Sequence, residues 1–239
     1  MTPSARQILP ELLDQLSPSD PRACRSRRDL RRVHRAMGSV SILRRAIVSL
    51  RLTVPPRRIL ELGAGDGSLL LRLARAMSPR WHDVALTLLD RQDLVSAETL
   101  LGYEALGWNV TVVREDVLDW VAKGTSTRFD LCIACLFLHH FDANVLTALM
   151  RAIASSADAF VACEPRRNWF ARLGSSLVVL LGANFVTRED AAKSVRAGFT
   201  DQELTVHWPH QDGAWSCKEF PAFPFAHCFT AVSENASRE

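Results

Sequence analysis

Long apolar runs are scarce in this sequence of 239 residues, which limits the classes of protein to consider. No stretch of 18 consecutive apolar residues occurs, so we expect no membrane-spanning helix. The richest candidate, LVVLLGANFV at 177–186, is too short and contains Gly182 and Asn184, so we interpret it as a core or interface segment. The first residues also lack the continuous apolar core of a signal peptide, and we therefore expect a cytoplasmic protein.

The six cysteines show no pattern that would hold a structural metal. Cys132 and Cys135 form a C-x-x-C pair, but no second pair or histidine cluster follows at the spacing of a zinc site. Several cysteines lie within apolar, strand-like runs, which is typical of buried, reduced thiols in the cytosol. We therefore expect reduced thiols and no bound metal.

Acidic residues are almost absent from residues 22–58, which hold twelve arginines and a single acid, Asp29. Because the whole chain has a net charge of only +3, the remainder is net acidic, and this disfavours binding of nucleic acid by the whole protein. The arginines either form the solvated face of a helix or bind an anionic or carrier-bound substrate. The second hypothesis concerns Arg27, Arg28, Arg31 and Arg32.

Residues 1–56 are predicted to form a helical N-terminal lid or extension. Apolar residues recur every three or four positions at 6–16 and again at 30–50, with arginines on the opposite face of the second segment. The breaker SPSDP at 17–21 separates the two segments, and a break near Gly38 would divide the second into two helices. Two prolines at 55 and 56 end the helical pattern, and a second unit spans residues 57–239.

From residue 57 onward, short apolar runs alternate with segments of helical spacing. We expect strands at 58–62, 83–90, 109–116, 129–138, 159–165, 203–208 and 225–232. We expect helices at 66–77, 94–107, 143–156, 167–182 and 187–199. This order predicts an α/β fold with a doubly wound, mostly parallel seven-stranded sheet and helices on both faces. No helix separates the last two strands, so we expect an antiparallel strand pair at the C-terminal edge.

Three glycines at 63, 65 and 67 follow the first predicted strand in the sequence ELGAGDGSL. In an open α/β sheet such a turn lies at the carboxyl ends of the strands, where ligands bind. The turn has no lysine, so it is not a P-loop, and Ser68 stands where a dinucleotide fingerprint requires its last glycine. Asp66 at the helix start would also repel a phosphate. Glu61 and Asp90, which end the first two strands, instead indicate a cationic, ribose-bearing ligand without phosphate.

The motif ELGAGDGSL, the acid of LTLLD, and the segments REDVLDW and FDLCIACLFLHHF resemble the motifs of class I S-adenosylmethionine-dependent methyltransferases of the small-molecule type. The resemblance covers roughly residues 58–232 and implies a Rossmann-like fold with S-adenosylmethionine as the cofactor. It also implies that Asp90 holds the ribose hydroxyls and that the segment at Asp116 flanks the adenine. The cofactor-binding residues implied in this way are Glu61, Gly63, Ala64, Gly65, Asp90, Arg91, Asp116, Val117 and Cys135.

The tetrad [DN]PP[YF], which members that methylate the amino groups of bases carry after the fourth strand, is absent. The sequence reads ACLF at 134–137 instead, which disfavours DNA or ribosomal RNA adenine as the acceptor. Methyl transfer is a displacement in which a positioned side chain can remove a proton from the nucleophile. The candidate bases are His139, His140 and Glu164, which follow or end the fourth and fifth strands, and, with less support, His207 and His227.

Large aromatic residues are concentrated at 165–225, where this family builds part of its substrate lid. We therefore expect an aromatic-lined cleft and a small, aromatic or lipophilic acceptor, such as a phenol or polyketide, that is methylated on oxygen. Methylation of RNA or of a carrier-bound substrate stays open as an alternative, as does a non-catalytic cofactor-binding scaffold. The residues also leave open whether the chain forms a homodimer.

Overall fold

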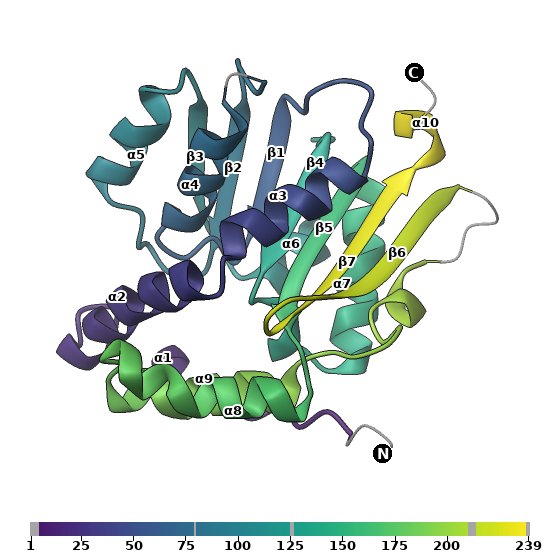
Figure 1. Ribbon diagram of the computed structural model, residues 1–239. Coiled ribbons are helices and arrows are strands. Elements are labelled where there is room, and N and C mark those ends of the chain that lie inside the picture. Colours follow the sequence, from purple (N-terminus) through teal and green to yellow (C-terminus); the bar gives the residue numbers. More distant parts are fainter. Residues whose placement is uncertain (1–4, 79, 125–126, 210–213, 238–239) are drawn as a thin grey trace.

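A seven-stranded sheet with the order β3-β2-β1-β4-β5-β7-β6 runs through the centre of the computed structural model, which describes residues 5–78, 80–124, 127–209 and 214–237 (Figure 1). The strands are β1 Arg58–Leu62, β2 Ala85–Asp90, β3 Asn109–Arg114, β4 Leu131–Cys135, β5 Ala159–Pro165, β6 Trp215–Ala222 and β7 Ala226–Ser233. Strands β1 to β5 pair in parallel, whereas β7 pairs antiparallel with both β5 and β6. This confirms the mostly parallel seven-stranded sheet with antiparallel strands at its C-terminal edge.

Helices cover both faces of the sheet because alternate residues of the buried strands point to opposite sides. One face packs against α3 Ser39–Ser49, α4 Ser68–Met77 and α5 Ala97–Glu104, and the other against α6 Val117–Lys123 and α7 Ala143–Ser156. In β1, for example, Ile59 belongs to the apolar core on the first face, and Leu60 to the core on the second. The two cores are separate, which gives the three-layer arrangement of a doubly wound fold.

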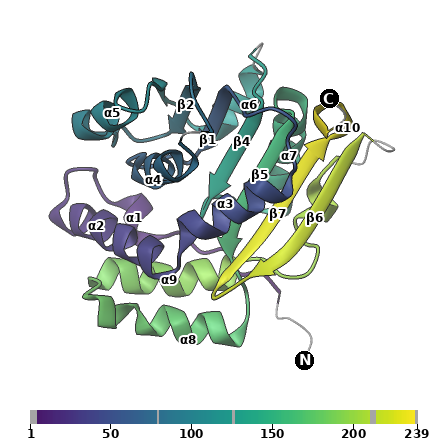
Figure 2. The same ribbon diagram turned by 45° about the horizontal axis from the view of Figure 1, so that its top comes forward.

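A further group of helices lies across the carboxyl ends of the parallel strands (Figures 1 and 2). It consists of α1 Leu12–Gln15, α2 Pro21–Ala36, α8 Trp169–Leu177, α9 Phe185–Ala197 and the short 3₁₀ helix η2 Val178–Leu181. The helix α2 starts at Pro21, where the side chain of Asp20 accepts a hydrogen bond from the backbone N–H of Arg22. It is separated from α3 by Gly38 at φ +66°, a left-handed conformation that suits glycine.

The N-terminal part of the chain is divided between two places in the fold. Helix α3 packs on the sheet, where Ile42, Leu43 and Ile47 belong to the apolar core, so it forms part of the α/β layers. Of the three N-terminal helices, only α1 and α2 lie beyond the carboxyl ends of the strands. Helix α1 is shorter than the helix expected at 6–16, because Pro10 precedes it and the carboxylate of Asp190 accepts from its first backbone N–H groups.

The prediction of a strand at 203–208 is wrong. Thr205–His207 forms a 3₁₀ turn, η3, and the edge strand is β6 at Trp215–Ala222. The carboxylate of Glu219 in β6 accepts hydrogen bonds from the backbone N–H groups of Leu204 and Thr205, which ties this turn to the sheet. Pro221 obscures the β pattern of the true strand, yet an edge strand tolerates it. Two further helices, α6 and α10 Glu234–Ser237, were not expected. Within the described ranges, no helix is long and apolar enough to span a membrane.

Candidate active site

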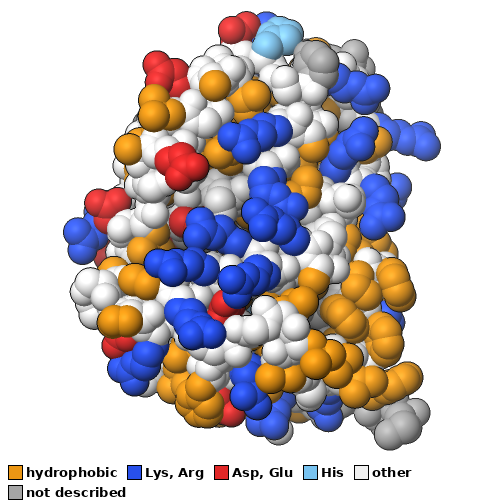
Figure 3. Space-filling model, turned by 60° about the vertical axis from the view of Figure 1, so that its left-hand side comes forward, with side chains coloured by type: hydrophobic (Ala, Val, Ile, Leu, Met, Phe, Trp, Pro, Cys, Tyr) orange, Lys and Arg blue, Asp and Glu red, His pale blue; other side chains and the backbone are white. Residues whose placement is uncertain are grey.

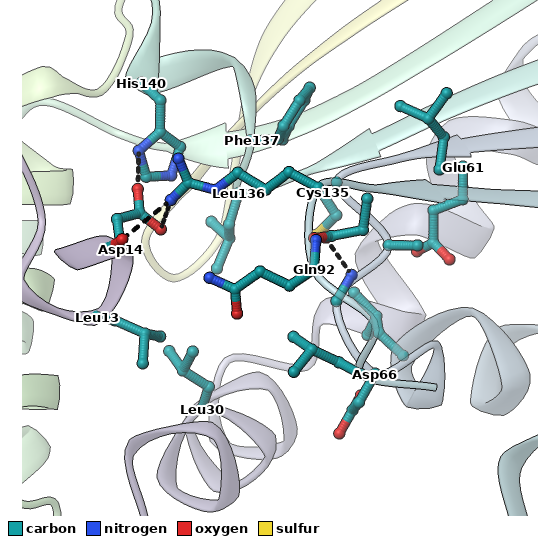
Figure 4. Close-up of a pocket in the computed structure, with 18 of the residues that line it drawn as sticks. Leu13, Asp14, Leu30, Glu61, Asp66, Gln92, Cys135, Leu136, Phe137 and His140 are labelled. Carbon is teal, nitrogen blue, oxygen red and sulfur yellow. Dashed lines mark hydrogen bonds and ion pairs between the residues drawn. The ribbon is translucent and has the colours of Figure 1, made fainter. Parts of the chain in front are cut away.

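A cavity of about 340 Å³ lies between the carboxyl ends of β1 to β4 and the helices α1 and α2 (Figure 4). Its walls come from the β1–α4 turn, the segments that follow β2, β3 and β4, and the two N-terminal helices. All nine residues predicted to bind the cofactor line it: Glu61, Gly63, Ala64, Gly65, Asp90, Arg91, Asp116, Val117 and Cys135. The topology therefore brings together positions that are far apart in the sequence, and their role in binding stays a prediction.

The glycine turn between β1 and α4 depends on left-handed backbone conformations. Gly63, Gly65 and Gly67 all have positive φ angles, between +56° and +67°. A Cβ atom at Gly63 would collide with the ring of Phe137, whereas one at Gly65 would have no protein atom within 4 Å. A side chain at position 65 would therefore not collide with the rest of the protein. Glycine at this position leaves the backbone open to the cavity.

Asp90, at the end of β2, holds this turn in place. One carboxylate oxygen accepts a hydrogen bond from the backbone N–H of Gly65 at 2.8 Å, and the other accepts from the backbone N–H of Gln92 at 2.8 Å. The next predicted acid, Asp116, is the N-cap of α6 and accepts from the backbone N–H of Leu118 at 2.8 Å. Carboxylate oxygens have further lone pairs, so both acids can also accept hydrogen bonds from a ligand.

Glu61, at the end of β1, is a buried carboxyl group without a compensating partner. It is 3% exposed, and its Oε2 atom is buried with no hydrogen-bond partner. Burial, together with the negative charges of Asp66 and Asp90, raises the pKa of Glu61 well above its usual range. A positively charged ligand in the cavity would relieve this unfavourable environment. The site is therefore suited to a cation without phosphate, such as S-adenosylmethionine.

Three contacts connect α1 and α2 to the turns that form the cavity. Arg91 forms an ion pair with Asp14 of α1 at 2.7 Å, and Arg31 of α2 forms one with Asp66 at 3.5 Å. Arg27 of α2 donates to the side-chain oxygen of Gln92 at 2.9 Å. Of the four arginines singled out in the sequence, Arg27 and Arg31 therefore line the cavity, whereas Arg28 and Arg32 do not.

His139 lies in the 3₁₀ turn η1, Leu138–His140, directly after β4, and is tightly held. Its Nδ1 atom lies 2.8 Å from Oε2 of Glu164, and its Nε2 atom lies 3.4 Å from Oε1 of Glu11, just before α1. Burial alone would lower the pKa of His139, but the two carboxylates outweigh it and raise the pKa to about 9. The ring is therefore protonated at neutral pH and links the N-terminal segment to β5.

Glu164 does not reach the cavity wall. It is fully buried, and its two oxygens accept hydrogen bonds from the backbone N–H groups of Phe137, Leu138 and His139, as well as pairing with the His139 ring. Its geometry is that of an anchor for the loop after β4. His207 pairs with Thr147, and the buried His227 pairs with Glu219, and neither lines the cavity.

His140 differs from its neighbour, although the sequence could not separate the two. It is partly exposed, lines the cavity, and its Nδ1 atom lies 3.7 Å from Oδ2 of Asp14 (Figure 4). Burial and the positive charge of His139 lower the pKa of His140 below its usual range. At neutral pH the ring is therefore uncharged and can accept a proton.

Glu11, His139 and His140 are close enough together to be considered as a metal site, since their ligand atoms all lie within 4.8 Å of one another. The two imidazole rings are tilted by 32° with centroids 4.3 Å apart. Both ring nitrogens of His139 already pair with carboxylates, Nδ1 with Glu164 and Nε2 with Glu11. The arrangement favours an ion pair between His139 and Glu11.

The aromatic residues at 165–225 do not form the expected cleft. Phe199 and Trp208 are buried in the core, whereas Trp169 and Phe185 are largely exposed, and none of them lines the cavity. The aromatic rings in the wall are Phe137 and Phe141, from the loop after β4. Sequence reasoning also missed Glu11, Leu13, Asp14 and Ser194, which carry no motif and reach the site only through the packing of α1 and α9.

Comparison with known proteins agrees with this geometry. Residues 59–157 match a family model described as a methyltransferase domain, and no curated protein sequence matches the chain. The structure of the plantazolicin methyltransferase BamL with a triazolic desmethylPZN analog and SAH aligns with a TM-score of 0.64 at 16% identity, covering 90% of this chain and 92% of that one.

Two other solved structures are similar. An O-methyltransferase family protein from Burkholderia thailandensis gives a TM-score of 0.58 at 16% identity over 90% of this chain and 61% of that one. Magnesium protoporphyrin IX methyltransferase (ChlM) from Synechocystis PCC 6803 with SAH gives 0.51 at 16% identity over 87% and 86%. At such identities the structural similarity shows only the fold, whereas the match to the family model shows a methyltransferase domain. Residues 59–157 therefore match a methyltransferase domain, and the whole chain shares its fold with methyltransferases that were solved with SAH.

Proposed function

We propose that the chain transfers a methyl group to an oxygen atom of a small acceptor with an aromatic or lipophilic body. The observation that carries this proposal is that the glycine turn and the neutral imidazole of His140 line one cavity. The methyltransferases that share the fold include one solved with a triazolic analog and one described as an O-methyltransferase family protein, which supports a small organic acceptor.

In this proposal the cofactor lies against the β1–α4 turn. Glu61 faces its positive charge, the open backbone at Gly65 lets it approach closely, and Asp90 accepts hydrogen bonds from its ribose hydroxyls. Asp116 and Val117 flank its adenine, and Ala64, Arg91 and Cys135 complete the wall. Bound S-adenosylmethionine would supply a methyl group on a sulfonium, and S-adenosylhomocysteine would be the leaving group when the acceptor oxygen takes that methyl group.

The chain's own contribution to the reaction is positioning and proton removal. His140 acts as the general base that takes the proton of the acceptor hydroxyl, because its imidazole is neutral at pH 7 and lines the cavity. His139 and Glu164 are positioning residues. The buried pair holds the η1 turn, and the positive charge of His139 keeps His140 in the neutral form.

The acceptor lies between the η1 loop and the N-terminal helices. Phe137, Phe141 and Leu13 provide an apolar surface beside His140, and α1 and α2 close the cavity through the contacts of Arg91, Arg31 and Arg27. Of the predicted N-terminal extension, the part that acts as a lid is therefore the segment from Glu11 to the end of α2.

The experiment that tests this function is a transfer assay with ¹³C-methyl-labelled S-adenosylmethionine against panels of phenols, aliphatic alcohols, amines and carrier-bound acids. The chemical shift of the new methyl carbon identifies the acceptor atom. We expect products that carry an O-methyl group, and we expect His140→Ala to form them about 10²–10⁴ times more slowly. Products methylated only on nitrogen or carbon would contradict the proposal.

An anionic or carrier-bound acceptor is supported by one observation, the presence of Arg27 and Arg31 in the cavity wall. Both guanidinium groups already contact partners, Gln92 and Asp66, and an anionic acceptor would have to compete with Asp66 for Arg31. The test is the variant Arg31→Gln. If its Michaelis constant rises for acidic acceptors but not for neutral ones, an anionic or carrier-bound acceptor is favoured.

A further inference from the structure

Helix α8 and the turn η2 expose a large apolar surface that the active site does not use. Seven of their side chains are exposed, Leu180 by 78% and Trp169 by 75%. The seven are Trp169, Phe170, Leu173, Leu177, Val179, Leu180 and Leu181, and Phe185 at the start of α9 adds an eighth that is 65% exposed. We refer to these eight residues as the α8 face.

The α8 face is not part of the cavity or of the core. None of its residues lines the cavity, and α9 lies between α8 and the rest of the group of helices (Figure 2). The interpretation of 177–186 as a core segment is wrong for most of its residues, because only Val178 and Val186 are buried. A contiguous apolar surface of this kind on a folded domain indicates a binding partner.

The charged residues near this surface are mostly positive, although Glu189 is exposed one turn after Phe185. No acidic residue occurs from Pro165 to Arg188, and Arg172 is the one charged residue between Trp169 and Thr187. The adjoining helix α2 exposes Arg25, Arg28 and Arg32. A Cβ atom on Gly182, at the end of η2, would lie 3.9 Å from a guanidinium nitrogen of Arg32, so Arg32 borders the apolar surface directly.

These arginines occupy one side of α2. The buried residues Ser26 and Asp29 of α2 hydrogen-bond to Thr187 and Asn184 of the α9 region, and Asp29 also forms an ion pair with Arg32 at 3.0 Å. Figure 3 shows basic side chains gathered over the side of the molecule on which α2 lies, with a hydrophobic area below them. The apolar and basic surfaces therefore adjoin on the outside of the molecule.

We infer that the α8 face and the α2 arginines form a docking surface for an anionic membrane. Trp, Phe and Leu side chains on one exposed helix face insert at the boundary between headgroups and acyl chains, and neighbouring arginines bind the anionic headgroups. A second copy of the chain is a poorer fit, because pairing two such faces would bring two sets of arginines together.

The test is co-sedimentation of the full chain with vesicles of phosphatidylcholine alone and of phosphatidylcholine mixed with phosphatidylglycerol. We expect binding to the mixed vesicles that weakens as salt is added. The triple variant Trp169→Ser/Leu180→Ser/Phe185→Ser should reduce the partition coefficient at least about tenfold. The variant Arg25→Gln/Arg28→Gln/Arg32→Gln should remove the preference for phosphatidylglycerol.

The matched control is Val54→Ser/Leu101→Ser/Val206→Ser, whose three side chains are 63–67% exposed on other parts of the surface. It should bind vesicles like the unchanged chain. The inference is overturned if the unchanged chain ignores the mixed vesicles, or if the triple serine variant binds them equally well. It is also overturned if light scattering shows a dimer that the triple variant converts to a monomer. Docking needs no methyl acceptor, so its failure is distinguishable from failure of the proposed function.

Discussion

The carboxylate of Asp90 accepts a hydrogen bond from the backbone N–H of Gly65 at 2.8 Å, and this contact joins the end of β2 to the turn after β1. The two residues are 25 positions apart, and parallel pairing of β1 with β2 brings them together. The same carboxylate also holds the backbone N–H of Gln92. Asp90 therefore shapes the cavity wall and presents remaining lone pairs to whatever the cavity holds.

Replacing Asp90 should weaken cofactor binding. Asp90→Ala removes charge-assisted hydrogen bonds, and we expect a loss of about 1–3 kcal/mol in the free energy of binding of S-adenosylmethionine. Isothermal titration measures this loss, with Asp93→Ala as the control, because Asp93 is exposed and outside the cavity wall. An unchanged affinity in Asp90→Ala would remove this residue from the cofactor site.

A pair of glycine variants separates backbone strain from obstruction of the cavity. Gly65→Ala and Gly107→Ala both place alanine at a positive φ angle, and neither Cβ atom meets a protein atom within 4 Å. Both should lose about 1–2 kcal/mol of stability in denaturant unfolding. Only Gly65→Ala should also lose cofactor binding, because its methyl group faces the cavity. Equal affinities in the two variants would contradict close approach of the cofactor at Gly65.

Glu61 should couple cofactor binding to the release of a proton. Its pKa is raised well above the usual range by burial and neighbouring acids, and a bound cation would favour the ionised form and lower that pKa. Affinity for S-adenosylmethionine should therefore fall as pH falls. Titrations in buffers of different ionisation enthalpy should detect the released proton in the unchanged chain, and Glu61→Gln should abolish it. Proton release that persists in Glu61→Gln would point to another group.

His140 should be needed for turnover and not for cofactor binding. Because its pKa lies below the usual value, the base is already neutral at pH 7, and activity should fall only under more acidic conditions. We expect His140→Ala to reduce kcat by a factor of about 10²–10⁴ and to remove that acidic limb, while the affinity for S-adenosylmethionine stays the same. If the rate and the pH profile survive the substitution, the base must be sought elsewhere.

His139 should make the stability of the fold depend on pH. Its pKa is about 9 in the folded chain, compared with 6.5 for the ordinary side chain, so its contribution is complete below 6.5 and disappears as pH rises through 9. The difference corresponds to a loss of roughly 3 kcal/mol at most. Denaturant unfolding between pH 6 and pH 10 measures it. His139→Gln, which keeps a polar side chain, should show a smaller loss over the same interval.

The order of strands and helices could be predicted because each buried strand is a short apolar run and each helix repeats its apolar residues every three or four positions. The motif acids Glu61 and Asp90 could be assigned to one site because the carboxyl ends of parallel strands meet at one edge. The edge strand β6 escaped prediction, because an edge strand needs only one apolar face and Pro221 disguises it.

The sequence by itself determined the parallel sheet and the glycine turn, since these depend on local patterns and on the spacing of one βαβ unit. Only the tertiary structure decided the rest of the site. It brought Glu11 next to His139 across more than a hundred residues, distinguished a charged His139 from a neutral His140, and turned Glu164 inward as an anchor. The physical reason is that burial and neighbouring charges set protonation, and both arise only when distant segments pack.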